Sequence, residues 1–286
     1  MIDETVEQIE DMRTHSSSEV AITAIEALKY TLDGDHATVE EYLRSLTRNC
    51  RALRHADPSH ASLFSATKSV ESTVLGAEPE TIDEARSVTL AAIDSEIATI
   101  TQAKERAAEA AAKLLEEDST YVTIDYSTTF LEALNRAEFD PETPATVYAM
   151  EARPRILGRK MARKMATIEG VKSSLIVDNA VGKVIDGCDG VFVGMTCVID
   201  DVLYNRVGTY PLALVADAHD VPMYAVGADT KVVDEAFVFS SEERPTSEVS
   251  LEPLDDVHIE NHMYDTTPIG LFDGVITDAG IRFSDV

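Results

Sequence analysis

Four residues between positions 205 and 209 carry groups that suit anion binding. Arg206 follows Asn205, and Gly208 and Thr209 open a stretch of helical spacing, NRVGTYPLALVADAHD. A helix start offers free N–H groups and the positive end of the helix dipole, and an arginine can clamp a phosphate through two hydrogen bonds. The segment is therefore a candidate site for a sugar phosphate or nucleotide. The alternative is ordinary turn chemistry, in which Thr209 only caps the helix.

Further polar side chains follow the ends of apolar runs. Asp178 ends one run, and Thr196 lies in the loop that follows the run GVFVG. Asp200 and Asp201 lie further along this loop, and Asp265 precedes Thr-Thr-Pro. These side chains could converge as a polar ligand site at one edge of a sheet. They could equally be helix caps and solvated loop acids, which an acidic chain supplies in abundance.

Known catalytic and cofactor motifs are absent from the sequence. It contains no GxGxxG, GxxxxGKS, GxSxG or HExxH motif, and its seven histidines and three cysteines form no Cys-His cluster. We therefore expect no metal and no cofactor. The sparse, odd set of cysteines is typical of reduced thiols.

The elements that must position these residues are strands alternating with helices. SLIVD and GVFVG are short runs rich in Val and Ile, as expected for strands buried on both faces of a parallel sheet. The stretch 173–228 predicts strand, helix, strand, loop, helix and strand, ending with PMYAV. Such βαβ units place ligands at the carboxyl ends of the strands.

The chain changes its pattern near residue 118. Residues 1–118 predict an N-terminal helical domain, in which Pro58 takes the first position of a helix. Residues 119–286 predict a Rossmann-like α/β domain with a mostly parallel sheet and helices on both faces, including a basic helix over 153–170.

The charge is strongly negative. There are 52 acidic and 24 basic residues, which gives a net charge of −28 spread along the whole chain. This favours adaptation to a salty cytoplasm, as in a halophilic archaeon, over binding to a basic partner. Without a basic stripe we expect no direct binding to nucleic acid. The sequence shows neither a signal peptide nor a membrane span, so we expect a cytoplasmic protein.

Several blocks carry a resemblance to a known family. They are ARPRILGRKMA at 152–162, VDNAVG at 177–182, the loop after Gly194, NRVGTYPLALVADAHDVPMYAV at 205–226, and YDTTP and DGVITDAG near the end. In these blocks and in their order, the sequence resembles one protein family. That family contains the alpha, beta and delta subunits of eukaryotic initiation factor 2B, ribose-1,5-bisphosphate isomerase and methylthioribose-1-phosphate isomerase. The resemblance implies a homodimer or larger homo-oligomer, with initiation factor 2 as one partner and a phosphorylated sugar or nucleotide as one ligand.

The same resemblance shows where the sequence departs from the isomerases. Their catalytic Cys and Asp correspond to Asp125 in TIDYS and to Thr196 in GMT, and the stretch RHADPSHAS lacks their R-P-T phosphate segment. A threonine hydroxyl cannot replace a carboxylate in acid–base work near neutral pH. We therefore expect a non-catalytic, initiation factor 2B-like protein. The alternatives are an isomerase with a rebuilt site, using Asp125 with Asp200 or Asp201, and a ligand sensor without turnover.

Overall fold

The computed structural model of the protein describes residues 2–10, 16–233, 237–241 and 243–283. The chain forms two compact units, Met1–Ala103 with Glu235–Ser240 and Lys104–Asp234 with Ser241–Val286. The division falls inside the long helix α5 (Ile82–Ala112), whereas the change of pattern suggested a boundary after residue 118. The difference arises because Ala108 and Ala111, near the end of α5, already pack in the core of the α/β unit.

The helical unit is built from amphipathic helices around one apolar core. Its elements are α1 (Ile2–Glu10), α2 (Ser17–Ala27), η1 (Leu28–Thr31), α3 (Val39–Ala56), α4 (Ala61–Gly76) and the first part of α5. Thr38 caps α3, because its hydroxyl accepts a hydrogen bond from the N–H of Glu41 at 3.2 Å. In the described parts of the chain, no helix is long and apolar enough to cross a membrane.

The expected helix start at Pro58 is wrong. The carboxylate of Asp57 accepts hydrogen bonds from the backbone N–H and the hydroxyl of Ser59. This turn delays the helix, so that α4 begins at Ala61 with His60 at the N-cap position.

The α/β unit contains a seven-stranded sheet in the order β11-β10-β7-β4-β1-β2-β3. The strands are β1 (Thr120–Ile124), β2 (Ala145–Met150), β3 (Val171–Ile176), β4 (Gly190–Gly194), β7 (Met223–Val226), β10 (Gly274–Thr277) and β11 (Gly280–Phe283). Only β11 runs antiparallel to its neighbour, and the strand order reverses between β1 and β4. This is the doubly wound, Rossmann-like arrangement.

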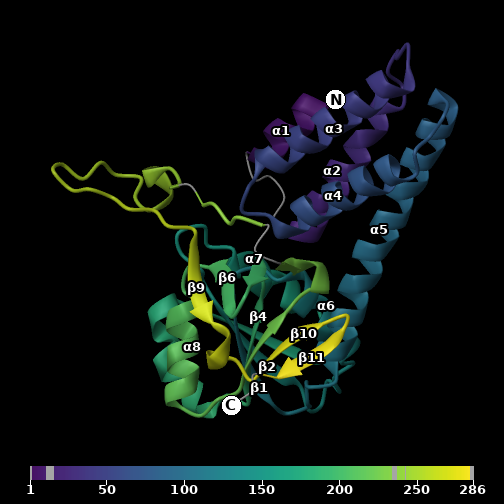
Figure 1. Cartoon of the computed structure of the whole chain (residues 1–286). Coiled ribbons are helices and arrows are strands. Elements are labelled where there is room, and N and C mark those ends of the chain that lie inside the picture. The colour runs from purple at the N-terminus through teal and green to yellow at the C-terminus, as the bar shows by residue number, and fades with distance from the viewer. Residues whose placement is uncertain (1, 11–15, 234–236, 242, 284–286) are drawn as a thin grey trace. The chain divides into compact units, whose positions relative to one another are not determined.

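Helices cover both faces of this sheet, as the sequence predicted (Figure 1). On one face α8 (Thr209–Ala218) packs through Leu212 against a core that includes Ile124 and Val193. On the other face α6 (Thr128–Arg136) and α7 (Gly158–Met165) pack around Phe192. The side chains of neighbouring positions 192 and 193 point to opposite faces, because side chains alternate along a strand.

The loop expected after β4 is a β-hairpin instead. It consists of β5 (Cys197–Ile199) and β6 (Val202–Arg206), which join β8 (Val232–Val233) and β9 (Tyr264–Pro268) in a second, four-stranded sheet. The two-residue turn at Asp200 and Asp201 suits a hairpin, because Asp200 has φ 50° and aspartate tolerates this left-handed conformation.

Three other expected elements differ from the structure. SLIVD does not lie in a strand buried on both faces: it overlaps the edge strand β3, where Leu175 is 48% exposed. The helix expected between β3 and β4 is replaced by the short 3₁₀ turns η2 (Asp178–Lys183) and η3 (Ile185–Gly187). The basic helix over 153–170 is shorter, because a turn at 153–157 precedes α7.

Candidate functional site

A pocket in the α/β unit lies at the carboxyl end of β1, next to the reversal of strand order. Its wall consists of nine residues: Asp125, Ala152, Arg153, Pro154, Arg155, Leu157, Arg206, Val207 and Met263. Open α/β sheets bind their ligands at this kind of position. The space that water can occupy within this wall is about 10 Å³, which is room for one water molecule. Side chains of the wall must therefore move to admit a larger ligand.

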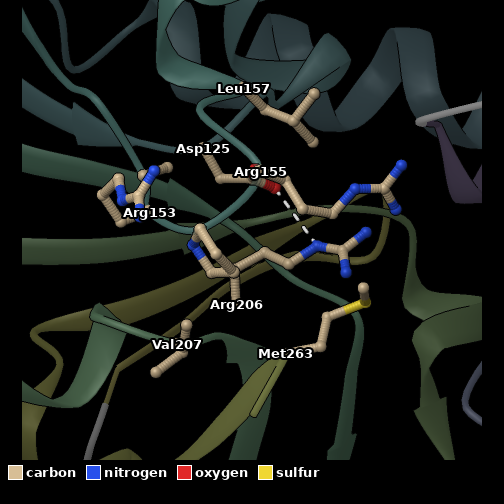
Figure 2. Close-up of a pocket in the computed structure, with 9 residues that line it drawn as sticks. Asp125, Arg153, Arg155, Leu157, Arg206, Val207 and Met263 are labelled. Atoms are coloured by element: carbon tan, nitrogen blue, oxygen red, sulfur yellow. Dashed lines mark ion pairs between the residues drawn. The ribbon is translucent and has the colours of Figure 1, made fainter. Parts of the chain in front are cut away.

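Asp125 and Arg206 form an ion pair across this pocket (Figure 2). Arg206 Nε lies 3.4 Å from Asp125 Oδ2, and the two side chains are only 17% and 16% exposed. The guanidinium also lies over the ring of Tyr264, 4.8 Å from its centroid. Asp125 adopts φ 65°, an uncommon conformation for a residue other than glycine, which is typical of functional sites.

The turn between β2 and α7 brings two more arginines to the pocket. Arg155 points to the same side of the pocket as Arg206, whereas Arg153 points to the other side (Figure 2). Burial, followed by repulsion from Arg206, lowers the pKa of Arg155. Three guanidinium groups and one carboxylate thus line the pocket, in a chain where acidic residues outnumber basic ones. The pocket suits an anionic ligand.

Asp178 shapes this turn and is absent from the pocket wall. Its two carboxylate oxygens accept hydrogen bonds from the backbone N–H groups of Ala152, at 2.7 Å, and Arg153, at 2.8 Å. Ala152 adopts φ 60°, so these bonds hold a backbone conformation that alanine rarely takes. The structure therefore places the predicted ligand residue Asp178 behind the pocket, where it positions the arginine-bearing turn.

The start of α8 is occupied by a side chain of the protein itself. Asp265 Oδ2 accepts hydrogen bonds from the N–H groups of Gly208, at 2.8 Å, and Tyr210, at 3.1 Å. Burial raises the pKa of Asp265, and the hydrogen bonds from the helix start oppose this shift. The carboxylate of Asp265 thus takes up the N–H group of Gly208, at the place that the sequence suggested for a phosphate, and phosphate binding by Gly208 and Thr209 stays a prediction.

Asn205, Thr209 and Thr196 form a separate set of hydrogen bonds beside the pocket. Asn205 and Thr209 are buried, and Asn205 Nδ2 donates to Thr209 Oγ1 at 3.1 Å. Thr209 Oγ1 donates to the carbonyl of Arg206 at 2.7 Å, and Thr196 Oγ1 lies 3.5 Å from Asn205 Oδ1. None of these three lines the pocket. The bonds fix the backbone that presents Arg206.

Asp200 and Asp201 do not face the pocket. Both are exposed at the turn of the β5–β6 hairpin, while Arg206 lies at the opposite end of β6. Because each strand residue advances the chain by roughly 3.3 Å, the turn cannot supply a partner for Asp125. The hypothesis that Asp125 works with Asp200 or Asp201 is therefore wrong.

Sequence reasoning missed Arg153, Arg155 and Met263 as pocket residues. The first two lie in the block ARPRILGRKMA, which contributed only to the resemblance and was expected to be helical from residue 153. The signal was the proline at 154, because the residue before a proline is disfavoured in helical conformation.

Comparisons with known proteins agree with this fold. The sequence model of the Initiation factor 2 subunit family matches residues 13–283. A ribose 1,5-bisphosphate isomerase of Haloterrigena turkmenica is 27% identical, covering 96% of this chain and 88% of that protein. A ribose 1,5-bisphosphate isomerase of Methanocaldococcus jannaschii is also 27% identical, over 98% of this chain and 91% of the relative.

A solved structure of translation initiation factor eIF-2B from Pyrococcus horikoshii has the same fold. It superposes with a TM-score of 0.82 at 22% identity, covering 99% of this chain and 97% of that one. The expectation of a non-catalytic protein is contradicted by the relatives over nearly the whole chain, because they are isomerases. From the match over residues 13–283, the chain belongs to the Initiation factor 2 subunit family.

Proposed function

We propose that the protein is an aldose–ketose isomerase of a phosphorylated sugar, similar to the ribose 1,5-bisphosphate isomerases. The single observation that carries this proposal is the Asp125 carboxylate in a pocket lined by Arg153, Arg155 and Arg206. The arginines would bind phosphate, and the carboxylate would move protons. The relatives at 27% identity support this substrate class.

Asp125 can serve both halves of the reaction. Because the C1 oxygen of a sugar 1-phosphate is esterified, the ring itself opens in the reaction. A base removes the proton from C2, the electron pair of the broken C–H bond forms the C1=C2 double bond of an enol, and the bond from C1 to the ring oxygen breaks as that oxygen takes up a proton. Proton transfer to C1 with loss of the proton from the C2 hydroxyl yields the ketose, so no proton is consumed overall, and one carboxylate can carry the proton between C2 and C1. Asp125 is the only carboxylate among the nine residues of the pocket wall, and Thr196 lies outside it.

The test is direct observation of turnover. Purified protein in high salt is incubated with ribose-1,5-bisphosphate and, separately, methylthioribose-1-phosphate, and the ketose is followed by NMR. Asp125→Asn should lower the rate by about 100-fold or more. Asp255→Asn changes an exposed aspartate outside the pocket and should leave the rate unchanged. Absence of ketose from both substrates with the wild-type protein would refute the proposal.

A homo-oligomer fits the same proposal. One neighbour by fold, at a TM-score of 0.75 and 19% identity, is a subunit in a tetrameric eIF2B complex of C. thermophilum. In this chain the edge strand β3 and the residue after it expose Leu175, at 48%, and Val177, at 60%. Exposed apolar side chains on an unpaired strand edge favour pairing with a second copy. Contact with initiation factor 2 stays a prediction from the resemblance.

A further inference from the structure

A second carboxylate lies beside the arginines of the pocket. Glu248, in the 3₁₀ turn η5 (Thr246–Glu248), is outside the pocket wall. Its Oε1 lies 4.0 Å from Arg155 Nε and 3.8 Å from a terminal guanidinium nitrogen of Arg244. The three side chains are only 20–24% exposed. Water therefore screens these charges less than it would at the surface.

The carboxylate is held in place by an amide. Asn261 is buried, and its Nδ2 donates to Glu248 Oε2 at 3.0 Å and to the carbonyl of Pro245 at 2.9 Å. The distances from Glu248 to the two arginines exceed those of hydrogen bonds. The position of Glu248 is thus fixed by Asn261, while its attraction for the arginines is electrostatic.

The arginines near Glu248 keep the capacity to bind another anion. Arg244 Nε is buried and has no hydrogen-bond partner within the described ranges. Arg155 is repelled by Arg206 and Arg244 and attracted by Glu248 and Asp125. Three arginines, Arg155, Arg206 and Arg244, thus interact with two carboxylates. The cluster carries a net charge of about +1, and it would carry about +2 without Glu248.

We propose that Glu248 is a specificity-determining residue that competes with the ligand for the pocket arginines. The negative charge of Glu248 attracts Arg155 and holds it in the pocket. The phosphate of an incoming ligand then replaces Glu248 as the anion that attracts Arg155. By lowering the positive charge of the cluster, Glu248 weakens the binding of highly charged anions most. This inference rests on the proposed function, because it names a residue that sets the phosphate affinity of the same site.

The test compares phosphate binding by the full-length variants Glu248→Gln and Glu248→Ala. Glutamine keeps an oxygen that can accept the hydrogen bond from Asn261, whereas alanine removes it together with the charge. Glu252→Gln is the matched control, because it removes an exposed negative charge from the same segment. Calorimetric titration with inorganic phosphate and pyrophosphate at one fixed salt concentration measures the dissociation constants, and thermal unfolding shows that each variant is folded.

The expected result is about threefold to tenfold tighter phosphate binding by Glu248→Gln than by Glu252→Gln, with a larger gain for pyrophosphate. Glu248→Ala, once shown to be folded, should also bind phosphate more tightly than Glu252→Gln. Equal or weaker binding by Glu248→Gln overturns the inference, because replacing a residue that only positions the arginines would weaken phosphate binding. Turnover plays no part in this measurement, so a failure of the isomerase proposal would be seen separately.

Discussion

Arg206 Nε lies 3.4 Å from Asp125 Oδ2, although the two residues come from strands of different sheets. Asp125 follows β1 of the seven-stranded sheet, and Arg206 ends β6 of the four-stranded sheet. The ion pair thus ties the two sheets together at the pocket. Because both side chains are mostly buried, removing either one would leave the other as an uncompensated buried charge.

Replacing Arg206 should weaken anion binding. Arg206→Gln removes one of three guanidinium groups from the pocket wall and leaves Asp125 without its ion-pair partner. We expect phosphate binding to weaken by about tenfold, since charge-assisted contacts of arginine with phosphate are strong. Calorimetry with phosphate measures the effect. Arg163→Gln, at an exposed position on α7, serves as the control, and equal affinities of the two variants would contradict the role of Arg206.

Gly158 should tolerate no side chain. A Cβ at this position would lie 1.7 Å from the carbonyl oxygen of Met150. Because that atom belongs to the backbone at the end of β2, it cannot swing aside. We expect Gly158→Ala to lower the free energy of unfolding by about 3 kcal/mol or more, as measured by chemical denaturation. Gly182→Ala meets no atom within 4 Å, so a similar loss in that control would argue against the steric explanation.

Lys231 should make stability depend on pH in the alkaline range. Its Nζ donates to the carbonyl of Met195 at 2.9 Å, and burial lowers its pKa from 10.5 to about 8. Between about pH 8 and pH 10.5 the unfolded chain binds more protons than the folded chain. The free energy of unfolding therefore increases as pH rises through this range, and this gain is lost as pH falls through the folded pKa.

The measurement compares wild type with Lys231→Met. The free energy of unfolding of wild type, relative to the variant, should increase by roughly 2–3 kcal/mol between pH 7 and pH 10.5. Burial raises the pKa of nearby Cys197 to about 12, which acts in the opposite direction. The charge of Lys231 opposes this shift of the Cys197 pKa, so replacing the lysine raises that pKa further. The folded thiol therefore stays protonated up to pH 10.5 in both proteins, and the difference reports on Lys231. A difference that stays constant or falls with pH would exclude this linkage.

The exposed edge of the sheet should form the contact between copies. Leu175→Asp places a charge on β3, where the leucine is 48% exposed. If two copies meet there, the variant should have about half the mass of wild type in light scattering, because burying an unpaired carboxylate is costly. Leu251→Asp changes an even more exposed leucine, at 90%, and should leave the mass unchanged. Dimers that persist in Leu175→Asp would place the contact elsewhere.

The sequence by itself determined the fold class and most of the elements. Short Val- and Ile-rich runs between helical patterns indicated the parallel sheet, and GVFVG and PMYAV became β4 and β7. The spacing of apolar residues is a local property of the chain, and it indicates whether an element is buried on one face or on both. Motif order was enough to indicate the family, whereas the departures at Asp125 and Thr196 led to the wrong expectation of a non-catalytic protein.

Only the tertiary structure decided which polar residues meet. Arg206 was predicted at a ligand site, but its partner Asp125 and its neighbour Arg155 come from separate strand ends. The N–H group of Gly208, where the sequence suggested a phosphate, donates a hydrogen bond to Asp265, which lies on β9. A helix start attracts any nearby anion, and local sequence does not say which distant residue supplies it. Strand order and register are set by packing over the whole unit, so the convergence of these charges could be read only from the folded chain.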